Sequence, residues 1–192
     1  MSGSIWMHLR SIGRNMSVAQ ESFEIAIKDV EELIETYDLL NREHKDRDPE
    51  VLKRAGIIMA MTAWETYVED RFSQLVTSHL VGLKGSPVDS YIQGKVQRDL
   101  RYFNTPNSQK TKVLFDGFIG KDITESWTWE SFDAARSRET LNMYIRLRGD
   151  VVHRAVTDKQ QAHPVKKDDV QKCFRFLKAL VRVMDDALES LV

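Results

Sequence analysis

Apolar side chains recur at intervals of three and four residues along most of the chain, the spacing that gathers them on one face of an α-helix. The first such stretch begins after Ser17, a residue suited to cap a helix, and ends near Leu40. The second begins at Asp48-Pro49, with the aspartate expected as N-cap and the proline in the first turn, and ends near Leu80. The pattern therefore predicts two long amphipathic helices in the first half of the chain.

Further helices are expected in the second half, separated by glycine, proline and asparagine residues that favour turns. Their predicted ranges are 89–100, 110–118, 137–156 and 167–188, with a loop over 120–129 that Trp127 and Trp129 pin to the bundle. No segment shows the alternation of a half-buried strand, and no repeat is present. The sequence predicts an all-α fold, an up-and-down helical bundle with short extra helices between the second long helix and the helix at 137–156.

The composition fits one domain, because 192 residues with only nine glycines and four prolines can form long elements around a core. We expect residues 17–192 to form a single domain and residues 1–16 to be a flexible N-terminal arm. The lone cysteine, Cys173, excludes an internal disulfide and lies among apolar positions, so we interpret it as a core residue rather than a nucleophile. No apolar run is long enough to cross a bilayer, and a cytoplasmic protein without membrane contact is expected. No metal site is visible, and no cofactor is expected.

Charge is distributed unevenly, although the formal net charge is only −1. Between residues 20 and 50 there are eleven acidic and four basic side chains, so the first helix should repel nucleic acid. A later stretch carries Lys95, Arg98 and Arg101 beside Tyr102, and Arg154 belongs to a basic series on the helix at 137–156. Such side chains are candidates for binding RNA, and the alternative is an ordinary solvated face.

Arg148 lies on the apolar face of its predicted helix, in line with Leu141 and Val151. An inward arginine without a partner would cost several kcal/mol, so we predict that it meets a carboxylate or a bound anion. On the second long helix Glu65 and Glu69 each fall ~20° from the apolar line, on opposite sides of it. Glu65 is the expected partner and Glu69 the less favoured one, and the alternative is an ion pair without any chemical role.

His153 follows Arg148 by five residues, which places it ~140° around the same helix and outside the apolar face. Asn142 and Arg146 share its side of the helix, and Asp150 lies within one turn of it. A histidine can take a proton from one group and return it to another near neutral pH. These polar residues and the two glutamates are candidate supporting residues for a site built on Arg148 and His153, unless the histidine is a bystander.

Arg148 and His153 match the pattern R-x4-6-H, and three further stretches accompany it. They are Ala63-Trp64-Glu65-Thr66-Tyr67-Val68-Glu69-Asp70, the Phe103-Asn104-Thr105-Pro106-Asn107 turn with Val113-Leu114-Phe115 after it, and Asp122-Ile123-Thr124-Glu125-Ser126-Trp127. Together these segments resemble the HEPN superfamily, and within it the RiboL-PSP-type branch. The resemblance covers the chain from about Ser17 to Leu188.

This resemblance implies a HEPN-like bundle that forms a homodimer, with the motif helices of two protomers facing one another across a cleft. Members with an intact motif are typically metal-independent endoribonucleases of toxin–antitoxin, antiphage or RNA-processing systems, and others are non-catalytic modules. Carried over by position, Arg148 and His153 would be the catalytic pair. The family often has Asn, Asp or His directly after the arginine, whereas this chain has Gly149, which puts the usual third polar residue in doubt.

Three functions remain open. The first is an endoribonuclease in which the 2′-hydroxyl of RNA attacks the phosphate, the histidine handles the proton and the arginine holds the phosphate, with an antitoxin or another protein as a further partner. The second is a catalytically silent HEPN module that binds RNA or a partner protein. The third is a structural helical dimer in which Arg148 only completes an ion pair.

Overall fold

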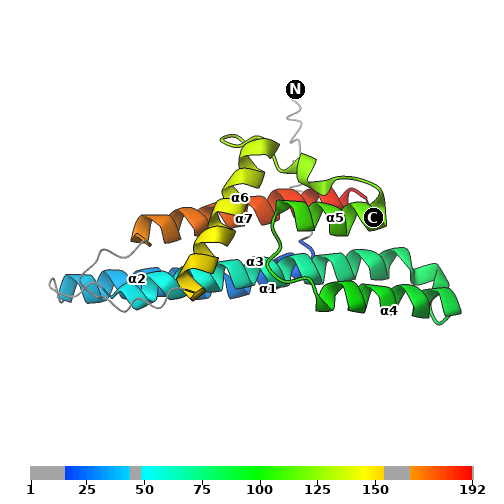
Figure 1. Ribbon diagram of the computed structural model, residues 1–192, viewed down its shortest axis with the longest axis horizontal. Helices are drawn as coiled ribbons and strands as arrows, with labels where there is room; N and C mark the ends of the chain where they lie inside the picture. Colours follow the sequence, from blue (N-terminus) through cyan, green and yellow to red (C-terminus); the bar gives the residue numbers. More distant parts are fainter. Residues whose placement is uncertain (1–15, 44–48, 154–164, 192) are drawn as a thin grey trace, which may run out of the picture.

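The computed structural model describes residues 16–43, 49–153 and 165–191, and these form a helical assembly (Figure 1). The α-helices are α1 (Val18–Ala26), α2 (Lys28–Glu43), α3 (Glu50–His79), α4 (Pro87–Arg101), α5 (Ser108–Ile119), α6 (Ala134–His153) and α7 (Lys167–Glu189), and the short 3-10 helices are η1 (Val81–Leu83) and η2 (Ile123–Ser126). No β-strand occurs in these ranges. The predicted all-α class is confirmed.

The first predicted helix forms with its expected cap but is divided in two. The hydroxyl oxygen of Ser17 accepts a hydrogen bond from the backbone N–H of Gln20 at 3.1 Å, which satisfies a donor that has no partner within the helix. At Ile27 the helical hydrogen-bonding pattern is interrupted, and α2 starts at the next residue. The side-chain spacing continues through this point, so the periodicity alone could not reveal the division.

Two other predictions concern the start of α3 and the range 120–129. α3 begins directly after Pro49, while Asp48, its predicted N-cap, lies outside the described residues. The prediction of an irregular loop over 120–129 was wrong in part, because this range contains η2. Asp122 caps η2, because its side chain accepts a hydrogen bond from the backbone N–H of Thr124 at 3.0 Å. A local bond between a polar side chain and the backbone has no signature in the spacing of apolar residues.

The core surrounds α3, which packs against α1, α2, α6 and α7. Trp64 of α3 and Trp127, just after η2, are fully buried and meet edge to face with ring centroids 6.0 Å apart. Trp129 packs against Phe176 of α7, so both tryptophans hold this segment to the bundle as predicted. Cys173 is buried in the same core, and burial raises the pKa of its thiol, which confirms the interpretation as a core residue.

α6 lies across the long axis of the molecule, and its path is steep relative to α3 and α7 (Figure 1). It packs against α3, α5 and η2. η1 follows the end of α3, and α4 then returns along α3, so the segment that joins α4 to α5 lies against the middle of α3. This arrangement brings the motif helix, the connecting segment and α3 together.

A buried polar cluster joins α1, α3 and α7 on another side of α3. Asp185 of α7 accepts hydrogen bonds from the backbone N–H of Ser17 at 3.1 Å and from its hydroxyl at 2.5 Å. The hydroxyl of Tyr67 donates to the same carboxylate at 3.3 Å, and Nε of Arg71 lies 2.9 Å from it. Arg71 also reaches Glu189 at 2.7 Å. The cluster compensates a buried guanidinium and fixes the start of α1 against α7.

Candidate functional site

Arg148 of α6 and Glu65 of α3 meet where the two helices pack. Nη2 of Arg148 lies 3.8 Å from Oε2 of Glu65, and the two side chains keep 26% and 20% of their surface exposed. The predicted ion pair is therefore confirmed, with Glu65 rather than Glu69 as the partner. Its exposure distinguishes it from the Arg71–Asp185 pair, whose side chains are only 3% and 1% exposed. A solute anion could reach Arg148 but not Arg71.

The segment between α4 and α5, residues 102–107, supplies a third member of this site. The backbone N–H of Thr105 donates to Oε1 of Glu65 at 2.7 Å, and Nη1 of Arg148 donates to the hydroxyl of Thr105 at 3.4 Å. The indole N–H of Trp64 donates to the backbone oxygen of Pro106 at 2.9 Å. Adjacent residues of α3 thus hold this segment against the guanidinium.

A second set of hydrogen bonds fixes the end of the same segment to α6. The backbone N–H of Ser108 donates to Oδ1 of Asn142 at 3.0 Å, and Nδ2 of Asn142 donates to the Ser108 hydroxyl at 2.9 Å. Nζ of Lys110 donates to the backbone oxygen of Asn104 at 2.5 Å. The side chain of Asn142, a candidate supporting residue, is thus engaged with the start of α5, and it fixes the distance between α5 and the motif helix.

The guanidinium of Arg148 is anchored without being saturated. Its contacts to Glu65 and Thr105 are both long, at 3.8 Å and 3.4 Å. Its Nε is buried and makes no hydrogen bond to any residue of the described ranges. Because a guanidinium has five N–H donors in one plane and the contacts of its two Nη groups are long, the side chain is oriented and its Nη groups keep donors for an anion that approaches from solvent.

Glu69 lies one helical turn after Glu65 on α3 and is half-buried. Burial raises the pKa of its carboxyl group, and the negative charges of Glu65 and Asp70 raise it further. Glu69 therefore holds its proton more tightly than an exposed glutamate does.

Two of the remaining candidate residues on α6 lie on its exposed face, opposite the buried one. Arg146 and Asp150 are exposed, whereas Leu141, Tyr144 and Val151 are buried in line with Arg148. A Cβ added at Gly149 would meet nothing within 4 Å, so the backbone is open at that point. His153 is the last residue of α6, and its side chain, together with Arg154, lies outside the described part of the chain.

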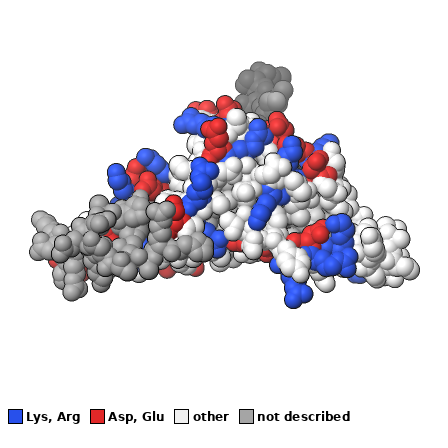
Figure 2. All heavy atoms as spheres, viewed as in Figure 1, with Lys and Arg blue, Asp and Glu red and all other residues white. Residues whose placement is uncertain are grey.

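The predicted basic stretch lies on α4 and leads into the 102–107 segment. Lys95, Arg98, Arg101 and Tyr102 are all exposed, and Tyr102 keeps 77% of its surface. Lys95 pairs with Asp99 on the same helix at 2.5 Å. Figure 2 shows basic side chains over α4 and along α6, with acidic ones between them. The surface formed by α4 and α6 is therefore basic in places and mixed in charge, not a continuous positive patch.

Thr105 is the residue of this site that the sequence did not single out. It adopts a φ of +57°, in the left-handed region that a β-branched residue rarely occupies. Hydrophobic periodicity gives no information about a turn residue, and only the quoted segment 103–107 pointed to this part of the chain. The Arg71–Asp185 pair was also missed, although both residues occur at the spacing of buried positions on their helices.

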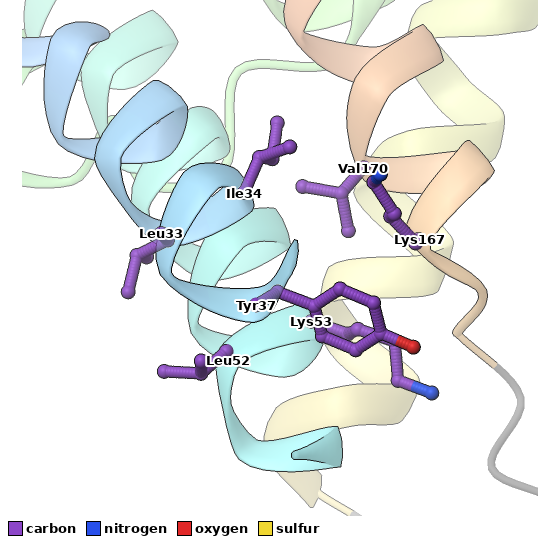
Figure 3. Close-up of a pocket in the computed structure, with 7 residues that line it drawn as sticks. All are labelled: Leu33, Ile34, Tyr37, Leu52, Lys53, Lys167 and Val170. Carbon is purple, nitrogen blue, oxygen red and sulfur yellow. The ribbon is translucent and has the colours of Figure 1, made fainter. Parts of the chain in front are cut away.

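Two small hollows lie away from Arg148. One is lined by α2, α3 and α7, where Tyr37 lies over Lys53 with 5.7 Å between the ammonium and the ring centre (Figure 3). The other lies beside His79, Phe118 and Leu191. Neither contains a candidate site residue. Within the described ranges no group of His, Cys, Asp and Glu side chains could hold a metal ion, and no helix is long and apolar enough to span a bilayer.

The sequence profile of the RiboL-PSP-HEPN family matches residues 24–190, which include the whole motif helix, the 102–107 segment and Glu65. No curated protein and no solved structure matches the chain. Since the profile covers nearly the full length of the sequence, the chain belongs to the RiboL-PSP-HEPN family.

Proposed function

We propose that this protein is a metal-independent endoribonuclease of HEPN type, with Arg148 as the phosphate-binding residue and His153 as the residue that handles the proton. The observation that carries this proposal is the state of Arg148. Its guanidinium is held in place by Glu65 and Thr105, is 26% exposed and has donors to spare. An ion pair that served only packing would be expected to use those donors internally.

In the proposed reaction the 2′-oxygen of RNA attacks the neighbouring phosphorus while His153 takes the proton of the 2′-hydroxyl. The bond from phosphorus to the 5′-oxygen breaks, and that oxygen takes up a proton. The fork of the Arg148 guanidinium matches two phosphate oxygens and stabilises the charge that develops on them. The products are a 2′,3′-cyclic phosphate and a 5′-hydroxyl, and DNA is not cleaved because it has no 2′-hydroxyl.

The proposal includes a homodimer with the α6 helices of two protomers facing one another. The family supports it, as does α6, which exposes Met143 and Val152 at 45% and 52% next to Arg146 and Asp150. Residues ~140° apart on one helix cannot both face a single phosphate without strain, whereas two symmetric copies of each can line one cleft. RNA would extend from this cleft over Arg101 and Tyr102, with Lys95 and Arg98 further along α4 and Arg154 beyond the end of α6.

The test is cleavage of a labelled single-stranded RNA in the presence of a chelator. We expect cleavage by the wild-type protein, a loss of about 100-fold or more in Arg148→Ala and in His153→Ala, and no cleavage of the all-deoxy strand. Arg148→Lys is the matched control, since it keeps the charge but loses the planar fork and should stay strongly impaired. Activity that requires a divalent cation, or that survives both alanine substitutions, would contradict the proposal.

The second candidate is a silent HEPN module that binds RNA or a partner protein, and Gly149 in place of the usual polar neighbour favours it. The same assay separates the two functions, because a silent module would bind the RNA without cutting it. As a toxin or antiphage nuclease, the protein would arrest growth when produced alone, and Arg148→Ala would relieve the arrest. An antitoxin or other partner would then be recovered with the wild-type protein and with this variant alike.

A further inference from the structure

Thr105 makes two hydrogen bonds at the Arg148 site, one to each member of the Arg148–Glu65 ion pair. Its backbone N–H donates to Oε1 of Glu65 at 2.7 Å. Its hydroxyl oxygen accepts from Nη1 of Arg148 at 3.4 Å. Thr105 therefore contacts the carboxylate of Glu65 with its backbone and the guanidinium of Arg148 with its side chain.

These contacts account for the loose geometry of the ion pair. An arginine and a glutamate on facing helices commonly form a two-pronged pair with N–O distances near ~2.8 Å. Here one oxygen of Glu65 is occupied by the Thr105 N–H, and the other remains 3.8 Å from Arg148. The carboxylate orients the guanidinium through its charge, but it does not occupy the N–H donors with a direct hydrogen bond.

The backbone of Thr105 is strained in the conformation that permits this arrangement. A φ of +57° is unfavourable for any residue with a Cβ and especially for a β-branched one. The segment is nevertheless fixed on both sides, by Trp64 at Pro106 and by Lys110 at Asn104. Glycine would fit this backbone with less strain but would lack the hydroxyl, which suggests that the side chain has a use at this position.

We propose that Thr105 is a positioning residue for Arg148, which keeps the guanidinium oriented and only partly paired so that it can receive an RNA phosphate. The inference rests on the proposed function, because it assigns the anion as a phosphodiester. It also goes beyond that function by naming the residue whose hydroxyl orients the Arg148 guanidinium beside Glu65. Thr105 itself need not touch the substrate.

The test compares Thr105→Gly with Thr105→Ser, which keeps the hydroxyl. Binding is measured with a ten-nucleotide single-stranded RNA that carries 2′-O-methyl groups throughout, at fixed salt, because this probe cannot be cleaved through a 2′-hydroxyl. Cleavage is measured with the unmodified strand, and Arg148→Ala is the reference for both. The 15N NMR signal of the Arg148 Nε–H group, assigned by its loss in Arg148→Ala, reports the guanidinium directly.

We expect Thr105→Gly to melt at the wild-type temperature or about 2–4 °C above it, because backbone strain is relieved. It should nevertheless bind the probe more weakly and lose about 10- to 100-fold in kcat/KM, with a shifted Nε–H signal. Thr105→Ser should remain within about threefold of wild type in both functional measurements. A residue that served the fold alone would change the melting temperature and leave probe affinity and the NMR signal unaltered.

The outcomes separate this inference from the function on which it rests. If Thr105→Gly binds and cleaves like wild type while Arg148→Ala does neither, the positioning role is overturned and the nuclease remains. A second outcome is that the wild-type protein fails to cleave RNA, while Thr105→Gly and Arg148→Ala weaken probe binding and Thr105→Ser does not. In that case the nuclease proposal falls and the positioning role stands. If Arg148→Ala binds the probe as tightly as wild type, both are overturned.

Discussion

Single residues in this protein carry charges in two distinct environments. Arg71 is 3% exposed and closely paired with Asp185, whereas Arg148 is 26% exposed and loosely paired with Glu65. The first arrangement satisfies a buried charge, and the second leaves one available. The difference lies in the partner geometry, since both residues occupy the apolar side of a helix.

Replacing Glu69 by glutamine should stabilise the protein at neutral pH. Burial, and then the charges of Glu65 and Asp70, raise the pKa of Glu69 above its ordinary value of 4.5. The folded state therefore binds this proton more tightly than the unfolded state, and ionisation of Glu69 lowers the free energy of unfolding as pH rises. Glu69→Gln removes that penalty.

Thermal unfolding measured between about pH 4 and about pH 8 checks this prediction, because this interval begins near the ordinary pKa of glutamate and extends past neutral pH. The gain in melting temperature should be largest at the neutral end and should shrink toward acid, where the wild-type side chain is protonated. Glu139→Gln, at an exposed position of α6, is the control and should give no comparable gain. A lower melting temperature for Glu69→Gln at neutral pH would contradict the assignment.

Two helical glycines, one in α3 and one in α6, differ in how closely a neighbouring helix approaches them. A Cβ added at Gly56 of α3 would lie 2.6 Å from Cγ1 of the buried Val170 in α7, while one added at Gly149 of α6 would meet nothing within 4 Å. Glycine is thus required for close packing in α3 and is not required sterically in α6. The two positions form a matched pair.

Alanine at these two glycines should change stability in opposite directions. Gly149→Ala should raise the free energy of unfolding by about 0.5–1 kcal/mol, because alanine has the higher helix propensity. Gly56→Ala should lower it by about 1–2 kcal/mol, because overpacking against Val170 outweighs the same gain. Urea unfolding measures both, and a stabilised Gly56→Ala protein would show that α3 and α7 can separate without cost.

Asp185 joins three helices, so its loss should be far more costly than the loss of a surface carboxylate. Asp185→Ala should lower the free energy of unfolding by about 3–5 kcal/mol, because Arg71 would stay buried and keep the half-exposed Glu189 as its acidic partner within the described residues. Asp99→Ala removes an exposed partner of Lys95 and should cost less than about 1 kcal/mol. Similar urea midpoints for the two variants would show that the buried cluster is dispensable.

At the scale of the whole molecule, the proposed nuclease requires two protomers. Arg148 is oriented by α3 and the 102–107 segment, while His153 stands at the end of α6, ~140° around the helix. A dimer in which Arg148 of one protomer works with His153 of the other would resolve this separation.

Mixing two inactive variants tests that arrangement. Arg148→Ala and His153→Ala, unfolded together and refolded as a mixture, should regain roughly a quarter of wild-type cleavage, because half of the dimers are mixed and one of their two sites is intact. Each variant refolded alone is the control. If the mixture stays as inactive as its components, the pair must act within one protomer or not at all.

Much of the fold could be predicted from the sequence, since side-chain spacing reports the buried face of each helix directly. The helices, the inward direction of Arg148 and the two candidate glutamates on α3 followed from it, because all depend on local periodicity, whereas the contact with Glu65 rather than Glu69 depends on how α3 and α6 pack. The division at Ile27 and the short η2 were missed, because single backbone interruptions and local caps leave that periodicity unchanged.

The sequence by itself determined which residues lie on which face of a helix, and hence the class of fold, while its motif segments indicated the family. Only the tertiary structure decided how the faces meet: that Thr105 bonds to both Glu65 and Arg148, that Asn142 holds α5, and that Arg71 rather than Arg148 is the deeply buried arginine. The physical reason is that spacing along a helix sets direction, while distance and solvent access depend on segments far apart in the chain.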